Sequence, residues 1–202
     1  MCTQYKVLLI FDEVISGFRV GFEGAAGYYN IQPDIITYGK IIGGGMPVGA
    51  YGANAEIMGH VTPDGNVYQA GTLSGNPVAM AAGFTAASQL LEEGFYENLA
   101  KTTQDFVATI QSYCDDKGYE VHINTIGSIF WIAFTKDDIR RADQINPASM
   151  EKFKILHSYL LDNGIYLGPS GYEVGFISAA HTAEELAAAS KKICQGMDLV
   201  YA

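Results

Sequence analysis

The chain has 202 residues, of which 49% are hydrophobic and 17% are charged, a composition able to bury a core in one large domain or two small ones. Its formal net charge of −10 argues against a broad basic patch, and therefore against nucleic acid as a partner. Its apolar runs fall short of the roughly 20 residues that a membrane-spanning helix needs, so no membrane partner is expected.

The first half of the chain predicts short strands followed by two helices. The first strand is an unbroken apolar run, typical of a strand buried on both faces of a parallel sheet, and it ends in Asp12-Glu13. Asn76-Pro77 is a favourable helix start, and Gly118 is a plausible helix end. The expected elements are strands at 7–11, 35–38 and 48–52 and helices at 77–93 and 95–117.

The second half has a different pattern of hydrophobic residues, which predicts strands and helices of an α+β type. The last helix is preceded by a capping box formed by Thr182 and Glu185. This change of pattern predicts a domain boundary between residues 1–117 and 118–202. The expected elements are strands at 119–124, 128–134 and 165–167 and helices at 148–163 and from 183 to the end.

The start of the chain is unusual for an α/β protein. It opens almost at once into a strand of the buried, parallel kind, and such a strand needs neighbours on both sides. We therefore expect the sequence to begin in the middle of a domain.

Cysteine and histidine residues give no metal pattern. The three cysteines are widely spaced without a CxxC pair, and the four histidines do not form an HExxH motif. No metal site is expected, and a reducing, cytoplasmic location fits. The first residues also lack the pattern of a signal peptide.

Three segments carry candidate chemistry, and each is ambiguous when taken alone. Asp12 lies at a strand end, where it could simply be a helix cap or a turn residue. Lys40 could be an ordinary surface lysine. Gly43 to Gly45 could be a mobile loop, and a nucleotide-binding module would rest on this triplet alone. The sequence contains neither the P-loop motif GxxxxGK[ST] nor the dinucleotide-binding motif GxGxxG, which excludes both kinds of nucleotide site.

In combination, the segments resemble a known family. Phe11-Asp12-Glu13-Val14, the run from Tyr38 through Lys40 to Gly52, and Tyr68 to Pro77 resemble the class III aminotransferases of pyridoxal-phosphate (PLP) fold type I. Within this family, Gln69 to Pro77 and Gly171 to Thr182 are most similar to the glutamate-1-semialdehyde 2,1-aminomutases. The resemblance covers essentially the whole chain.

The resemblance implies a role for each of several residues. Lys40 would bind PLP covalently and shuttle protons, for which its amine must be neutral. Asp12 would face the pyridine nitrogen of PLP and keep it protonated, while Val14 would pack on the ring. Thr72 and the backbone amides of its loop would bind the phosphate of the PLP in a neighbouring subunit. The resemblance therefore implies a homodimer with shared active sites. Glu173 would lie near the substrate; its plain alternative is a surface residue.

The implied fold is α/β: the C-terminal part of the large PLP domain with a mostly parallel sheet (1–117), then a small α+β domain (118–202). The implied reaction is the isomerisation of (S)-4-amino-5-oxopentanoate, a small amino acid, to 5-aminolevulinate. The alternatives are a class III aminotransferase with separate donor and acceptor, and an inactive fragment. Family members are about twice as long, and their N-terminal half supplies further cofactor contacts, so a fragment is expected.

Overall fold

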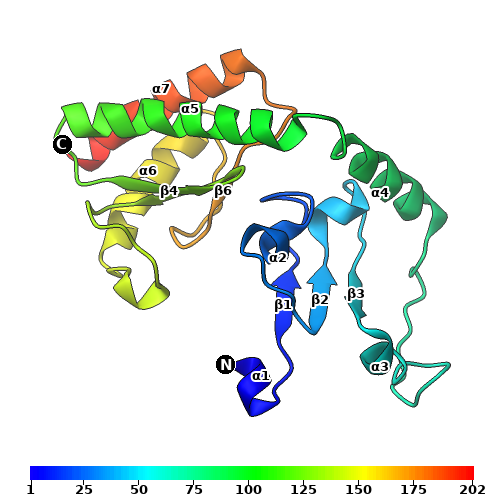
Figure 1. Ribbon diagram of the computed structural model, residues 1–202. Coiled ribbons are helices and arrows are strands. Elements are labelled where there is room, and N and C mark those ends of the chain that lie inside the picture. The colour runs from blue at the N-terminus through cyan, green and yellow to red at the C-terminus, as the bar shows by residue number, and fades with distance from the viewer. The chain divides into compact units, whose positions relative to one another are not determined.

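The structure is a computed structural model that describes residues 1–202. The chain divides into two compact units, Met1–Tyr96 and Glu97–Ala202, which we call the first and the second unit. Each mixes helices and strands (Figure 1). No helix combines the length and the apolar character that crossing a bilayer requires.

The first unit is built on a three-stranded sheet in the order β1-β2-β3, and β1 and β3 form its two edges. Strand β1 runs parallel to β2, and β3 runs antiparallel to β2. The three expected strands are therefore present, although the first one pairs three residues later than predicted. Their bounds are Ile10–Glu13 for β1, Ile35–Tyr38 for β2 and Ala50–Ala53 for β3.

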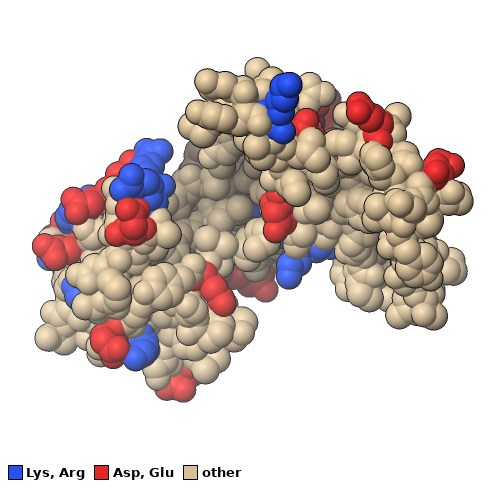
Figure 2. Space-filling model, turned by 90° about the horizontal axis from the view of Figure 1, so that it is seen from below, with Lys and Arg blue, Asp and Glu red and all other residues tan.

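The helices of the first unit are short except for α4. Asn76 caps α4, since its side-chain oxygen accepts hydrogen bonds from the amides of Val78 and Ala79. Pro77 occupies the first turn, as expected from its fixed φ. The helices are α1 (Cys2–Tyr5), α2 (Gly24–Tyr28), η1 (Lys40–Gly43), α3 (Ala55–Met58) and α4 (Pro77–Gln89). In the view of Figure 2, from below, the Lys, Arg, Asp and Glu side chains are scattered over a surface that is mostly uncharged.

The second unit packs three long helices with an antiparallel sheet in the order β4-β5-β6. Its core is contiguous, and Ile110, Leu156 and Met197 are completely buried in it. The elements are α5 (Phe95–Asp116), β4 (His122–Ile126), β5 (Ile129–Ala133), η2 (Ala142–Gln144), α6 (Ser149–Asp162), β6 (Gly175–Phe176) and α7 (Ala183–Val200). The Thr182–Glu185 capping box predicted for α7 is confirmed.

One predicted strand, 165–167, is wrong. The amide of Ile165 instead donates to the carbonyl of Leu160, which closes the end of α6, and the segment joins no sheet. The third strand is β6, which the sequence did not predict because it lies in a glycine-rich turn. Gly175 is required there, since a Cβ atom at this position would lie 2.2 Å from the ring of Phe130.

The division between the units falls at residue 96, one helix before the boundary expected at residue 117. Helix α5 belongs with the second unit because its apolar stripe is part of that unit's core. Phe106, Val107 and Ile110 are all buried in the cluster that also contains residues of α6 and α7. Helical periodicity showed the stripe but not which core would cover it.

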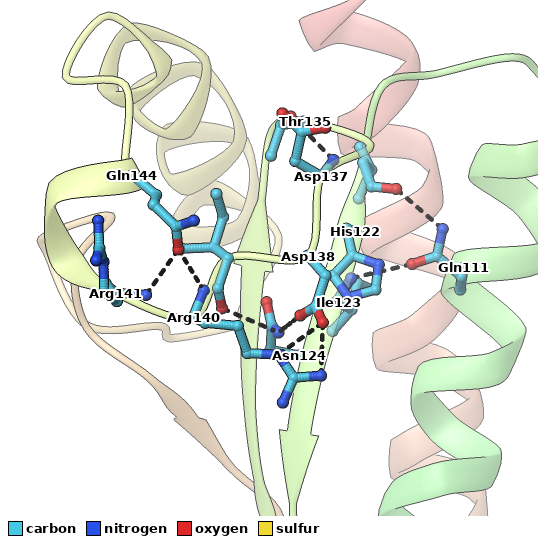
Figure 3. A network of polar contacts seen from close by, with 12 residues as sticks. Gln111, His122, Ile123, Asn124, Thr135, Asp137, Asp138, Arg140, Arg141 and Gln144 are labelled. Carbon is cyan, nitrogen blue, oxygen red and sulfur yellow. Dashed lines mark hydrogen bonds and ion pairs between the residues drawn. The ribbon is translucent and has the colours of Figure 1, made fainter.

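A polar network fixes the long connection after β5 to the sheet (Figure 3). Asn124 of β4 donates to the carboxylate of Asp138, which also accepts from Arg140 Nε at 2.6 Å. The side-chain oxygen of Gln144 accepts from the backbone amides of Arg140 and Arg141. The connection therefore has a defined path although it contains no strand.

The end of α7 carries a second polar cluster. The carboxylate of Asp198 accepts hydrogen bonds from the hydroxyl groups of Tyr113, at 2.7 Å, and Tyr119, at 2.8 Å. These bonds lower the pKa of Asp198 and raise the pKa of Tyr113 to about 12. The ring of Tyr119 stacks on Tyr201, the last residue but one.

We predict that Asp198→Asn lowers the pKa of Tyr113 from about 12 towards its ordinary value of 10, because the charged acceptor is lost. Since the tyrosine pKa is raised in the folded state, its contribution to stability is present below pH 10 and is lost as pH rises towards 12. Alkaline titration of tyrosinate absorbance, together with thermal unfolding from pH 8 to 12, measures both effects. Asp162→Asn, at the end of α6, is the control; an unchanged tyrosine titration in Asp198→Asn would contradict the assignment.

Candidate functional site

The carboxyl ends of β1 and β2 bring two of the predicted site residues to the same edge of the sheet. Because the strands are parallel and Asp12 lies opposite Thr37, the residues that follow them leave the sheet at one end. Lys40 comes two residues after β2, separated from it by Gly39. Open α/β sheets bind ligands at this end.

Asp12 is exposed and its carboxylate is oriented by two neighbours. One oxygen accepts from the amide of Val14 at 3.0 Å and from the hydroxyl of Thr37 at 3.5 Å. Side chains alternate along a strand, so Asp12 and Glu13 point to opposite faces. Asp12 therefore presents its remaining oxygen on a face where a ligand can reach it.

Glu13 is the buried partner on the other face, and its side chain is only 1% exposed. Its carboxylate accepts from the hydroxyl of Ser16 and from the amides of Ala25, at 2.9 Å, and Ala26, at 2.7 Å. Gly24 allows this approach, because a Cβ atom there would lie 2.6 Å from a Glu13 oxygen. Three donors compensate the buried charge, so Glu13 ties the end of β1 to α2.

Sequence reasoning quoted Glu13 only as a part of the first motif and gave it no role. The one available signal was a carboxylate that directly follows an apolar run. Burial, with a smaller contribution from the charge of Glu13, raises the pKa of Tyr38. Tyr38 and Glu13 lie opposite each other in the ladder, so Glu13 also supports the segment that leads to Lys40.

Lys40 has an unusual backbone and a free side chain. Its φ of 49° lies in the left-handed region, which costs a non-glycine residue on the order of 1–3 kcal/mol. Gly39 precedes it, and a Cβ atom there would lie 3.2 Å from Val14. The Lys40 amine is exposed and has no ion-pair or hydrogen-bond partner. The backbone around it is fixed while the amine is available.

The glycine triplet after Lys40 is a close contact rather than a loose loop. Gly44 has a φ of 56°, and a Cβ atom on it would lie 2.3 Å from the carbonyl oxygen of Ala82 in α4. Gly83 approaches the carbonyl of Ile42 equally closely, since its Cβ would lie 2.1 Å away. Backbone thus packs on backbone between η1 and α4, and this fixes the position of Lys40 at the start of η1.

An open pocket of about 630 Å³ surrounds Lys40. Val14 forms one wall, and Tyr38 and Gly39 lie beside the lysine. The segment 45–49 also lines the pocket, and its two glycines leave room for a ligand. Val14 and Lys40, to which the resemblance assigns cofactor contacts, therefore line the same pocket.

A smaller pocket of about 250 Å³ adjoins this wall and contains Gly71, Leu73, Ser74 and Gly75. The two pockets share the residues 47–49. Thr72 lies in the turn of this loop, is exposed, and lines neither pocket. Thr72 is therefore not among the residues that line the chain's own lysine pocket.

Glu173 belongs to the second unit, where it lines an open pocket of about 690 Å³ together with Phe130, Leu167 and His181. Its carboxylate lies against Gly168, which has no side chain to obstruct it, and forms no hydrogen bond or ion pair. On the same loop, the carbonyl of Gly171 accepts from the indole nitrogen of Trp131 at 2.8 Å. The loop that carries Glu173 is thus attached to β5.

Comparison with solved structures confirms the fold class. An omega-transaminase from Sphaerobacter thermophilus is 28% identical, with a TM-score of 0.86 over 100% of this chain and 46% of that chain. A β-phenylalanine aminotransferase from Variovorax paradoxus is 29% identical, with a TM-score of 0.84 over 98% and 45%. A glutamate-1-semialdehyde aminomutase from Pseudomonas aeruginosa PAO1 shares the fold at 21% identity, with a TM-score of 0.83 over 98% and 46%.

The chain spans about half the length of each of these proteins. The family model described as aminotransferase class III matches residues 1–198, which is nearly the whole sequence. With the fold and the family match in agreement, the chain belongs to the class III aminotransferase family.

Proposed function

We propose that this chain supplies the lysine-bearing part of a PLP-dependent enzyme that moves amino groups. The observation that carries the proposal is the unpaired amine of Lys40 in an open pocket, at the end of a parallel strand pair that also presents Asp12. Class III aminotransferases depend on PLP, and one similar structure is described as a transaminase with PLP bound. In this proposal residues 1–117 belong to the large PLP domain, with α5 as a connecting helix that packs on the core of the second unit, and 118–202 form the small domain.

The residues of the pocket fit the cofactor chemically. An amine that is free of any carboxylate partner can react with an aldehyde, whereas an ion-paired lysine cannot do so without first losing its partner. The carboxylate of Asp12 accepts hydrogen bonds from Val14 and Thr37, and it can accept another from a protonated ring nitrogen. Val14 offers an apolar contact for an aromatic ring. The backbone amides of the Gly71 loop suit a phosphate.

In the proposed mechanism, PLP would supply an electron sink when bound at this site. Lys40 holds the cofactor, and its Nζ then moves a proton between substrate carbon atoms. Asp12 keeps the proton on the ring nitrogen, since a nearby negative charge favours the protonated form. Thr72, which does not line the chain's own pocket, would bind the phosphate of PLP held by a second copy, so the site would need a homodimer.

For the reaction, we infer the isomerisation of (S)-4-amino-5-oxopentanoate to 5-aminolevulinate in the cytoplasm. The support is the similarity of Gln69 to Pro77 and of Gly171 to Thr182 to the aminomutases, and in this reading Glu173 contacts the substrate. A second candidate is a transaminase with separate donor and acceptor. It is favoured by similar structures above 25% identity, among them an omega-transaminase and a β-phenylalanine aminotransferase.

We predict that Lys40→Ala abolishes the covalent adduct that PLP and borohydride leave on the chain, because no other lysine lines the pocket. The measurement is peptide mapping after incubation with PLP and reduction. Lys6→Ala is the matched control, since Lys6 is exposed, belongs to the same unit and has a left-handed φ of 54°. An adduct that survives in Lys40→Ala would rule out the assignment.

Asp12→Asn is expected to leave PLP bound but to slow turnover by roughly 100-fold or more, the size of typical proton-transfer contributions. The amide keeps the shape of the side chain and loses the charge that holds the ring proton. Cofactor content and kcat are measured on the same preparation, with Asp64→Asn, in an exposed turn, as the control. Unchanged kcat in Asp12→Asn would exclude this role.

The two candidate reactions differ in their need for an acceptor. We expect conversion of (S)-4-amino-5-oxopentanoate to proceed without any α-keto acid, since an aminomutase returns the amino group to the same carbon skeleton. The assay compares product formation with and without 2-oxoglutarate. Strict dependence on the keto acid would select the transaminase with separate substrates.

A further inference from the structure

Helix α6 ends in an Asn-Gly pair. Asn163 is the C-cap of this helix, and it is the only one of the chain's eight asparagines that a glycine follows. Gly164 has a φ of 75°, and a Cβ atom at this position would have no neighbour within 4 Å. The peptide bond between the two residues therefore lies in open space, and no side chain shields its nitrogen.

A lysine of α7 contacts this peptide bond directly. Lys192 Nζ donates a hydrogen bond to the backbone carbonyl oxygen of Asn163 at 2.5 Å, although the two residues are 29 positions apart in the sequence. The bond is charge-assisted and partly buried, which makes it stronger than a hydrogen bond between neutral groups. Lys192 takes part in none of the ion pairs, so its charge acts on this carbonyl.

The contact favours one reaction of the Asn-Gly pair. When the backbone N–H of Gly164 loses its proton, the negative charge is shared with the carbonyl oxygen of Asn163, because the two atoms belong to one conjugated amide. A cation held at that oxygen stabilises the charge, as hydrogen-bond donors do in an oxyanion hole. Lys192 therefore makes the nitrogen of Gly164 easier to deprotonate and more available as a nucleophile.

We propose that Asn163 and Gly164 form a self-modification site, at which Lys192 promotes the deamidation of Asn163. The nitrogen of Gly164 attacks Cγ of Asn163, so that an N–Cγ bond forms and the Cγ–Nδ2 bond breaks. Ammonia leaves with the proton that the backbone gave up, and a cyclic imide remains. Water then adds to one of the imide carbonyls and opens the ring to aspartate or isoaspartate. Water is the only co-reactant, and no group is oxidised or reduced.

Two hydrogen bonds of the last helical turn oppose the reaction. Asn163 Nδ2 donates to the carbonyl oxygen of Tyr159 at 2.8 Å, and the amide of Gly164 donates to that of Leu161 at 3.1 Å. Both join neutral groups at a helix end, where hydrogen bonds open more readily than in the interior of a helix. The bond from Lys192 comes from α7 and does not depend on this turn.

The product would change the rim of the pocket that contains Glu173, because Gly164 and Lys192 also line it. A carboxylate at position 163 adds a negative charge at the C-terminus of α6, where the helix dipole disfavours it, and attracts Lys192 away from the backbone carbonyl. Isoaspartate also lengthens the main chain before Ile165, whose amide closes α6. We therefore expect the amide of Ile165 to exchange at least about tenfold faster in the modified chain.

The test follows the full 202-residue chain during incubation at mildly alkaline pH, by peptide mapping and mass spectrometry. We expect the acid to appear at position 163 before it appears at any other asparagine, and both aspartate and isoaspartate to form. Lys192→Met should slow the reaction at least about tenfold, because methionine keeps an apolar stem of similar length and lacks the charge at the carbonyl oxygen. Lys191→Met, at the neighbouring exposed lysine, is the matched control and should leave the rate unchanged.

The direction of the change separates a promoting lysine from a merely structural one. If Lys192 only held the end of α6 in place, its loss would open the last turn and speed the reaction. Equal rates in Lys192→Met and Lys191→Met, or a faster rate in Lys192→Met, would therefore overturn the proposal. So would an intact Asn163 in a chain whose other asparagines have reacted. Lys40→Ala should deamidate at the normal rate, so this test is independent of the PLP assignment.

Discussion

The parallel register of β1 and β2 is the constraint on which the candidate site depends, because it brings the ends of two separate strands to one edge. Asp12 lies opposite Thr37, and Lys40 follows two residues after the pair formed by Glu13 and Tyr38. A shift of the register by one residue would turn Asp12 to the face that Glu13 now occupies. The carboxylate would then lie among buried groups, and the lysine pocket would lose its acidic neighbour.

The buried carboxylate of Glu13 helps to fix this register. It accepts hydrogen bonds from Ser16, Ala25 and Ala26, which lie outside the sheet, and it fits only because position 24 is a glycine. Removing the acceptor would leave buried donors without partners, which is more costly than the loss of the bond itself. Asp12 therefore exposes its carboxylate on one face of β1, while Glu13 supports the strand from the other face.

Periodicity and motif spacing predicted the elements whose causes are local. The capping box of α7, the proline start of α4 and the three strands of the first unit were all anticipated. The strand expected at 165–167 was wrong, because the end of α6 captured the amide of Ile165. The ladder of β1 starts only at Ile10, because an apolar run does not specify where its partner begins.

Of the candidate site residues that the resemblance implied, Val14 and Lys40 line one pocket, and Asp12 lies at the same edge of the sheet. Their grouping follows from strand order, which a motif can indicate. Thr72 and Glu173 lie on loops, and the position of a loop residue relative to a ligand depends on contacts outside its own segment. Spacing in the sequence contains no information of that kind.

The hydrogen bond from Trp131 to the carbonyl of Gly171 has a practical consequence, because Trp131 is the chain's single tryptophan. Intrinsic indole fluorescence therefore comes from the second unit alone, at the point where the loop of Glu173 is attached to β5. An unfolding curve followed by this emission describes that unit and that loop. Melting of the sheet that carries Lys40 does not change the emission. The protein thus contains a built-in optical reporter for one of its two units.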